Sequence, residues 1–168
     1  MGAKFEVVVR PVEEVVPRGI APRAVAAIIA ENKAKAYSDL AKEHVVITAD
    51  TIVVLKGDIL GKPKDEMEAI EMLQRLSGET HQVITGITLF HLGKFNSFSE
   101  QTSVTFRELR SEEIRYYLKN DPPLDKAGAY GIQDWMGKIG ITRIEGDYYN
   151  VMGLPTARLY EALTNWKK

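Results

Sequence analysis

At residues 44–51 the sequence is HVVITADT, an apolar, β-branched run that ends in an acid and a threonine. Four to eight such residues in a row are typical of a strand covered on both faces of a sheet. We therefore predict a strand that ends at Ala49, with Asp50 just beyond it. A carboxylate in that place needs a cation, hydrogen-bond donors or a metal, because burying it alone is costly. Ligands of open α/β sheets bind at such strand ends, so the run also predicts a site.

The length and composition are those of one globular domain. The chain has 168 residues, which is enough to bury a core, and we take residues 1–168 as a single domain. A hydrophobic content of 45% and a net charge of −1 argue against disorder and against binding to nucleic acid or a membrane surface. The absence of cysteine excludes disulfides, thiolate zinc sites and cysteine nucleophiles. No apolar run approaches the roughly 18 residues of a spanning helix, so a cytoplasmic protein is expected.

The remaining pattern alternates strands with helices. Strands are expected at 5–9, 44–49, 51–55, 59–60, 81–90, 98–106 and 140–144. Helices are expected at 21–42, 66–76 with Asp65 as N-cap, 112–119 and after Pro155. Met67 and Tyr160 are placed on the apolar faces of the second and the last of these helices. The pattern predicts an α/β fold in which helices flank a layered, mixed β-sheet, with a long functional loop at 121–131.

Lys33 has an unusual place in the first predicted helix. Its neighbours three and four positions away are Ile29, Ala30, Ala36 and Tyr37, so it lies on the apolar face. A lysine there either extends its amine to water or pairs with an acid. It can also be a cation that is held for an anionic ligand. The sequence leaves both interpretations open.

The other candidate residues lie in loops. Lys62, beside a proline, is either a phosphate contact or a solvated charge. The segment 125–133, DKAGAYGIQ, combines two charges with glycines that let backbone approach a ligand and an amide that donates and accepts. The segment 146–150 is similar in type, although a turn with an exposed acid explains it almost as well. Scattered histidines without ligand spacing are expected to have structural or surface roles: His44, His81 and His91.

Several short motifs follow one another along the chain: ADT (49–51), GKP (61–63), LSG and THQV (76–78 and 80–83), DKAGAYGIQ (125–133), and GDY and GLP (146–148 and 153–155). In their order and spacing they resemble those of the Maf family, and the likeness extends from Phe5 almost to the end. The resemblance implies the fold of the inosine triphosphatase (Maf/Ham-like) superfamily. It also implies hydrolysis of a nucleoside triphosphate to the monophosphate and pyrophosphate with a divalent metal cation. The Asp-Thr pair with a Gly-Ile-Gln motif is similar to the branch that acts on dTTP and UTP.

The resemblance implies roles for single residues. Asp50 is the expected proton acceptor, and Thr51 and Gln133 are expected to select the base by their donors and acceptors. Glu14 and Asp50 are the expected ligands of magnesium or manganese, which bind carboxylates well. Substrate phosphates and the leaving pyrophosphate are expected to meet three lysines as point charges: Lys33, Lys62 and Lys126.

Two further expectations come from the same resemblance. The resemblance implies a strand and a Ser-x-x-Arg turn upstream of the segment equivalent to 5–7. This sequence begins only four residues before that segment. Without the arginine of that turn, the rate is expected to fall. A homodimer is implied. The alternative function is a non-catalytic nucleotide-binding or interaction protein connected with septum formation, and the substrate is left open between normal and modified pyrimidine nucleotides.

Overall fold

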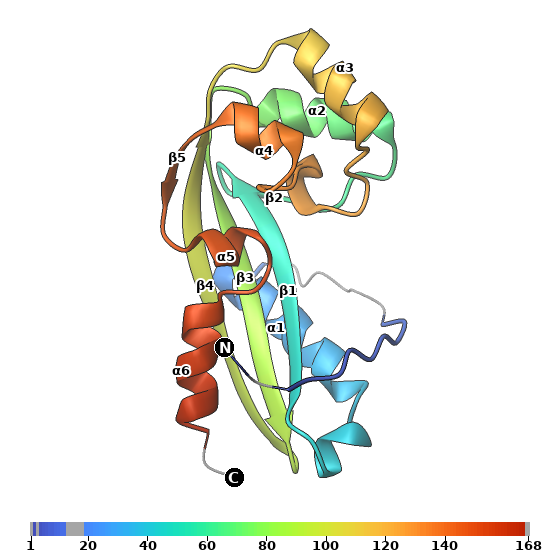
Figure 1. Cartoon of the computed structure of the whole chain (residues 1–168), viewed down its shortest axis with the longest axis vertical. Coiled ribbons are helices and arrows are strands. Elements are labelled where there is room, and N and C mark those ends of the chain that lie inside the picture. Colours follow the sequence, from blue (N-terminus) through green and yellow to red (C-terminus); the bar gives the residue numbers. More distant parts are fainter. Residues whose placement is uncertain (1, 3, 13–18, 167–168) are drawn as a thin grey trace.

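A five-stranded antiparallel sheet forms the long body of the molecule (Figure 1). The computed structural model describes residue 2, residues 4–12 and residues 19–166. Within them the strand order is β2-β1-β3-β4-β5, with β1 (Val46–Leu55), β2 (Asp58–Leu60), β3 (Thr80–His91), β4 (Lys94–Phe106) and β5 (Ile141–Glu145). The helices are α1 (Pro22–Lys35), α2 (Glu66–Leu76), α3 (Ser111–Asn120), α4 (Trp135–Gly140), α5 (Tyr148–Val151) and α6 (Thr156–Thr164), with short 3₁₀ turns η1 (Leu40–Lys42) and η2 (Ala127–Ala129).

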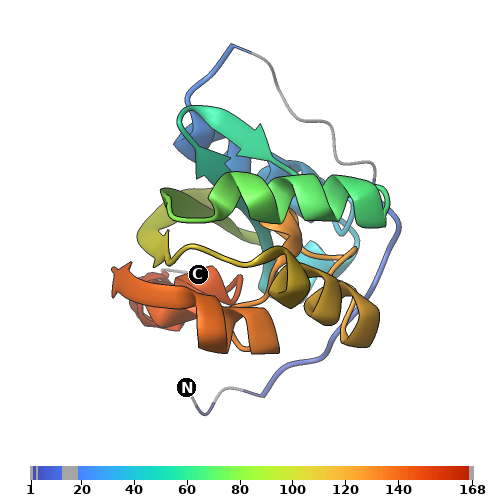
Figure 2. The ribbon, with the colours of Figure 1, turned by 90° about the horizontal axis from the view of Figure 1, so that it is seen from above.

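The helices cover the sheet on both faces and at one end. The helix α1 packs on one face, where Val25 and Ile29 meet Ile84 of β3. On the opposite face Leu159 of α6 packs against Ile87. The helices α2, α3 and α4 gather over one end of the sheet (Figures 1 and 2). The predicted α/β fold with a sheet flanked by helices is therefore confirmed.

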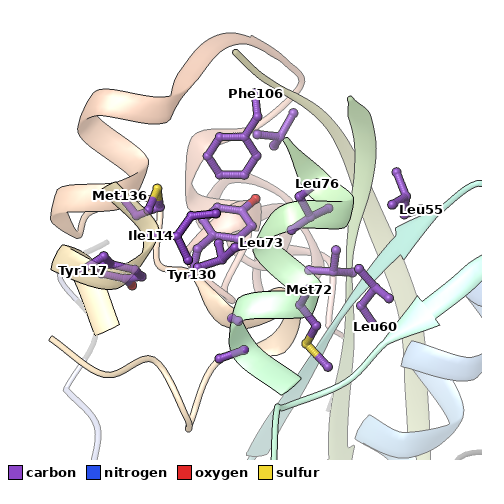
Figure 3. Packing of buried hydrophobic residues seen from close by; sticks show 14 of the residues in the cluster. Leu55, Leu60, Met72, Leu73, Leu76, Phe106, Ile114, Tyr117, Tyr130 and Met136 are labelled. Carbon is purple, nitrogen blue, oxygen red and sulfur yellow. The ribbon is translucent and has the colours of Figure 1, made fainter. Parts of the chain in front are cut away.

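The largest hydrophobic core lies between these end helices and the sheet (Figure 3). It joins Leu73 of α2 and Tyr117 of α3 to Phe106, at the end of β4. Tyr130, from the loop before α4, also lies in this core. Part of the segment DKAGAYGIQ therefore belongs to the largest hydrophobic core.

Two tight turns explain the antiparallel pairing of β1 with β2 and of β3 with β4. Lys56 and Gly57 have φ of 52° and 94°, and Leu92 and Gly93 have φ of 47° and 76°. Two consecutive positive φ values are those of a type I′ turn, which reverses the chain into a neighbouring antiparallel strand. All pairings among the described strands are antiparallel, so the prediction of a mixed sheet is wrong.

The segment 5–9 does not form the predicted strand. It has no regular secondary structure and pairs with none of the described strands, and the Phe5 and Val9 side chains are 82% and 86% exposed. Its attachment is Arg10, whose backbone N–H donates to the Tyr37 hydroxyl and whose guanidinium binds Asp39 at 2.7 Å.

The first helix is shorter than the predicted 21–42 and ends at Lys35. Arg10 donates to the carbonyl oxygen of Ala36 at 2.7 Å, which takes the place of a further helical bond at this end. A separate 3₁₀ turn, η1, follows.

The apolar faces predicted for α2 and α6 each include one residue that is exposed in the structure. Met67 is 70% exposed, because the buried stripe of α2 is Ala69, Met72, Leu73 and Leu76. Tyr160 of α6 is 57% exposed, because Leu159 points to the sheet instead. The N-cap of α2 is as predicted: Asp65 accepts a hydrogen bond from the Glu68 backbone N–H at 2.8 Å.

Candidate active site

A cleft of about 360 Å³ lies beside β1, between the strand, the loop 125–133 and the segment 151–153. All the predicted site residues that the structure describes line it: Lys33, Asp50, Thr51, Lys62, Lys126 and Gln133. Glu14 lies outside the described residues. Residues from four separate parts of the sequence therefore line one cleft.

Asp50 lies in the middle of β1, and the prediction of a strand that ends at Ala49 is wrong. The ladder with β3 continues through it, with Asp50 opposite Gly86 and Thr51 opposite Thr85. The strand tolerates a polar pair at its centre because both side chains line the cleft instead of entering a core. The runs 44–49 and 51–55 are therefore parts of one strand.

Gly86 determines how closely α1 approaches Asp50. A Cβ at Gly86 would overlap the backbone of Ala26 and Ala27 in α1, so only glycine allows this contact. The close approach brings α1 onto the sheet face on which Asp50 lies. No periodicity in the sequence pointed to this glycine.

The close packing of α1 places the Lys33 ammonium 2.6 Å from Oδ1 of Asp50. The sequence left open whether Lys33 pairs with an acid or is held for an anionic ligand, and in the structure it pairs with an acid. The acid itself lines the cleft, so the pairing places the cation there as well. A charge-assisted hydrogen bond of this length is strong and holds both side chains in one orientation.

Asp50 and Thr51 lie on opposite faces of the sheet, as successive strand residues must. Both still reach the cleft, because β2 pairs only with 53–55 of β1 and no described strand pairs with the outer edge of 46–52. The cleft therefore wraps around this edge of β1.

The loop 125–133 packs against β1, and its backbone is bonded to the segment that follows β2. Gly128 N–H donates to the carbonyl oxygen of Gly61 at 3.0 Å, which ties this loop to the one that carries Lys62. Gly128 has φ of 70°, and a Cβ there would press on the Val53 side chain. The next residue, Ala129, also has a positive φ, 59°, which is strained for a residue with a side chain. Strain of this kind is concentrated at functional sites.

Lys126 lies between two acids. Its ammonium is 2.9 Å from Oδ1 of Asp125 and 3.7 Å from Oδ2 of Asp134. Burial lowers the pKa of Lys126, but the hydrogen bond to Asp125 and the nearby carboxylates outweigh it, so the pKa is raised. The side chain is therefore a fully charged cation whose position is determined by its neighbours.

The motifs also contained a buried pair that the sequence analysis did not recognise. His81 Nε2 and the Tyr130 hydroxyl are 2.7 Å apart, and Nδ1 of His81 has no partner. Burial lowers the pKa of His81 to about 4. Tyr130 lines the cleft, and His81, which does not, is hydrogen-bonded to it. His81 was predicted to have a structural or surface role, and it is buried. Its place in a strand of apolar residues could have indicated that burial.

Of the residues that the structure describes, Asp50 and Asp125 contribute the carboxylates that line the cleft. Among the described residues no group of three or more His, Cys, Asp or Glu side chains surrounds a common point. Magnesium usually takes only one or two protein carboxylates, and substrate phosphates and water complete its shell. The donor set at this cleft fits such a cation.

Lysines, a paired carboxylate, a hydroxyl and an amide in one concave site make a binding place for a small anionic molecule with a polar ring. Among the described residues, none of the helices has the length and apolarity to cross a bilayer. The sequence matches the family model described as Maf-like protein over residues 1–166, and the chain belongs to the Maf family.

Three relatives illustrate how closely the chain resembles other members. It is 50% identical over 165 residues to a dTTP/UTP pyrophosphatase of Phocaeicola vulgatus, covering 97% of this chain and 86% of the relative. It is 47% identical over 167 residues to a protein of the same name from Porphyromonas gingivalis, with 97% and 84% covered. A Bacillus cytotoxicus protein, again named dTTP/UTP pyrophosphatase, is 50% identical over 159 residues, with 95% and 83% covered.

Proposed function

We propose that this protein hydrolyses dTTP and UTP to the nucleoside monophosphate and pyrophosphate. The observation that carries the proposal is that the Lys33–Asp50 ion pair shares one cleft with Thr51 and Gln133. Relatives of 47–50% identity named dTTP/UTP pyrophosphatase support it. Modified pyrimidine nucleotides with the same carbonyl–imide edge belong to the same substrate class.

In the proposed reaction, water attacks the α-phosphorus and pyrophosphate leaves. Asp50 accepts the proton of that water as general base. Lys33, 2.6 Å from Asp50, holds the carboxylate in place and adds positive charge beside the α-phosphate. Lys62 and Lys126 bind the phosphate oxygens of the leaving group as point charges. Thr51 and Gln133 contact the base.

A divalent cation, magnesium or manganese, is part of the proposal. Asp50, together with Glu14, would hold it through carboxylate oxygens. When bound, it would neutralise the negative charge that develops as pyrophosphate leaves. Within the part of the chain that the structure describes, the cleft is lined by lysines and by few carboxylates, which supports a cation that the substrate itself helps to bind.

We also propose that the protein acts as a cytoplasmic homodimer. Membership of the Maf family supports this part of the proposal. Light scattering of the purified protein at micromolar concentration tests the dimer directly. A monomer across that concentration range would contradict it.

The proposed activity is tested by pyrophosphate release from dTTP, UTP, CTP and GTP, each with magnesium or manganese and again with EDTA. We expect dTTP and UTP to be the best substrates and EDTA to abolish release. Asp50→Asn should lower kcat by about 100-fold or more, as loss of a general base does. The control is Asp58→Asn, whose carboxylate is exposed and binds Arg75 at 2.7 Å, away from the cleft.

Three outcomes would contradict the proposal or one of its parts. A preference for GTP would show that the cleft does not select the pyrimidine edge. No release from any nucleotide, with binding retained, would show a nucleotide-binding protein without turnover. Asp50→Asn with most of its activity left would remove Asp50 from the role of base.

A further inference from the structure

Behind Thr51 lies a group of buried hydroxyls and an amide that no proposed catalytic step uses. Thr51 and Thr85 are directly opposite each other on β1 and β3, and their hydroxyl oxygens are 2.9 Å apart. Thr85 and Asn150 are completely buried. Asn150 belongs to the short helix α5, which lies over β3 and β4 (Figure 1). These contacts connect the proposed base-selecting residue to the interior of the protein.

The direction of the hydrogen bond between the two threonines follows from counting protons. The Thr85 hydroxyl lies 2.8 Å from the carbonyl oxygen of Asn150, which has no proton to give. A hydroxyl has one proton and two acceptor sites, so Thr85 donates its only proton to this carbonyl oxygen. Thr85 must then accept in its contact with Thr51. The Thr51 hydroxyl is therefore the donor, and its proton points inward.

The carbonyl of Asn150 cannot easily move away, because the side chain of the same residue is anchored. Its amide nitrogen donates to the carbonyl oxygen of Val83 at 3.0 Å and to the Thr102 hydroxyl at 2.9 Å. Thr102 in turn donates to the carbonyl oxygen of Asp147 at 3.0 Å. The bond to Val83, a pure acceptor, sets which end of the Asn150 amide is nitrogen. Each donor in the chain is thus assigned by an oxygen that can only accept.

We infer that Thr85 is a positioning residue for base selection: it takes the Thr51 proton, so that Thr51 offers only acceptor lone pairs to the cleft. This inference rests on the proposed function and deepens it. An acceptor at this place matches the N3–H donor of uracil and thymine. The N3 of cytosine carries a lone pair, which would face the lone pairs of Thr51. Leaving such polar groups unpaired in a closed site is a strong source of discrimination.

The test is Thr85→Val, which keeps the shape and removes the hydroxyl. The Thr51 proton is then released from its partner and can be given to cytosine N3. We expect the ratio of kcat/KM for UTP to that for CTP to fall by about tenfold or more. Thr85→Ser keeps a hydroxyl and should restore the wild-type ratio. Thr88→Val is the matched control, because Thr88 is also a buried threonine of β3 but binds Ser97 at 3.0 Å.

Binding of UMP and CMP, measured by calorimetry on the same proteins, separates this inference from the proposed reaction. If the wild type binds UMP more tightly than CMP and Thr85→Val lowers that preference, the inference holds even where no hydrolysis is seen. If Thr85→Val lowers both affinities equally, Thr85 is only structural and the inference is wrong. An unchanged ratio in kcat/KM and in binding would overturn it as well.

Discussion

The ammonium of Lys33 lies 2.6 Å from Oδ1 of Asp50, so one ion pair joins α1 to the centre of β1. The two side chains are 21% and 9% exposed, compared with 47% and 70% in the exposed Arg75–Asp58 pair. Partial burial weakens the screening by water and strengthens the interaction. The same contact therefore contributes to packing and places a cation at the candidate active site.

Replacing Lys33 tests this double role. Lys33→Met keeps much of the side-chain volume but removes the charge that holds Asp50. We expect kcat/KM for UTP to fall by about 100-fold, with a loss of about 1–3 kcal/mol in the free energy of unfolding. Lys35→Met is the control, because Lys35 lies on the exposed side of α1 and pairs with Glu31 at 3.1 Å. Equal effects of the two substitutions on kcat/KM would show that the pair has no part in the reaction.

Gly86→Ala is predicted to separate α1 from the sheet. The new methyl group would overlap the backbone of Ala26 and Ala27, which cannot rotate away as a side chain can. Overpacking of this kind costs about 1–3 kcal/mol or more of unfolding free energy, which urea denaturation measures. The control is Gly61→Ala, because nothing lies within 4 Å of a Cβ there. A Gly86→Ala protein as stable as the wild type would mean that α1 can move away from the sheet without lowering the free energy of unfolding.

His81 is predicted to make stability depend on pH in mildly acidic solution. Burial lowers the pKa of His81 from 6.5 to about 4 in the folded protein. Between these values the unfolded chain binds a proton that the folded protein does not, so the free energy of unfolding falls as the pH falls from 6.5 towards 4. Above 6.5 both states are neutral at His81 and this contribution is constant. The total loss is about 3 kcal/mol, with a slope of up to about 1.4 kcal/mol per pH unit.

Urea denaturation at pH values from 7.5 to 5 measures this slope. The range avoids Glu113, because the hydrogen bond from Arg107 lowers the pKa of that carboxyl to about 2 and its effect appears at lower pH. His81→Phe should remove most of the slope, because phenylalanine does not titrate. The variant should still fold, since a phenylalanine ring can stack on Phe106 as the imidazole does. His91→Gln should keep it. A slope that survives in His81→Phe would assign the pH dependence to other groups.

Local patterns in the sequence predicted more of the site than of the contacts that assemble it. The place of Lys33 on an apolar helix face, together with an acid after a β-branched run, already indicated a partner for Asp50. Gly86 gave no such signal, because a close approach of a helix to a strand depends on two segments about 60 residues apart. The direction of the Thr51 proton depends on the Asn150 carbonyl, 65 residues beyond Thr85.

The strand predicted at 5–9 failed for a related reason. Alternation and β-branching describe which residues suit a strand, but a strand also needs a neighbour for its backbone groups. The described structure places no strand beside this segment, so Phe5 and Val9 remain exposed. The extension of β1 through Asp50 was missed because a polar pair usually marks a strand end, whereas here it marks an edge that faces a cleft.

The last prediction concerns the hydroxyl of Tyr117, which supports the loop that carries Gln133. It donates to Oδ2 of Asp134 at 2.8 Å, and the Gly131 N–H donates to it at 3.4 Å. Tyr117→Phe should therefore lower the free energy of unfolding by about 1.5–3 kcal/mol, because a buried hydrogen bond to a carboxylate is lost. Tyr116→Phe, on the same helix, is the control: Tyr116 is exposed, its ring contact with Trp135 survives, and the change should be within about 0.5 kcal/mol. We also expect a higher KM for UTP in Tyr117→Phe alone, since the loop between Gly131 and Asp134 loses its attachment to α3. Equal stability of the two variants in urea denaturation would show that Asp134 finds another donor and that Tyr117 does not support the loop.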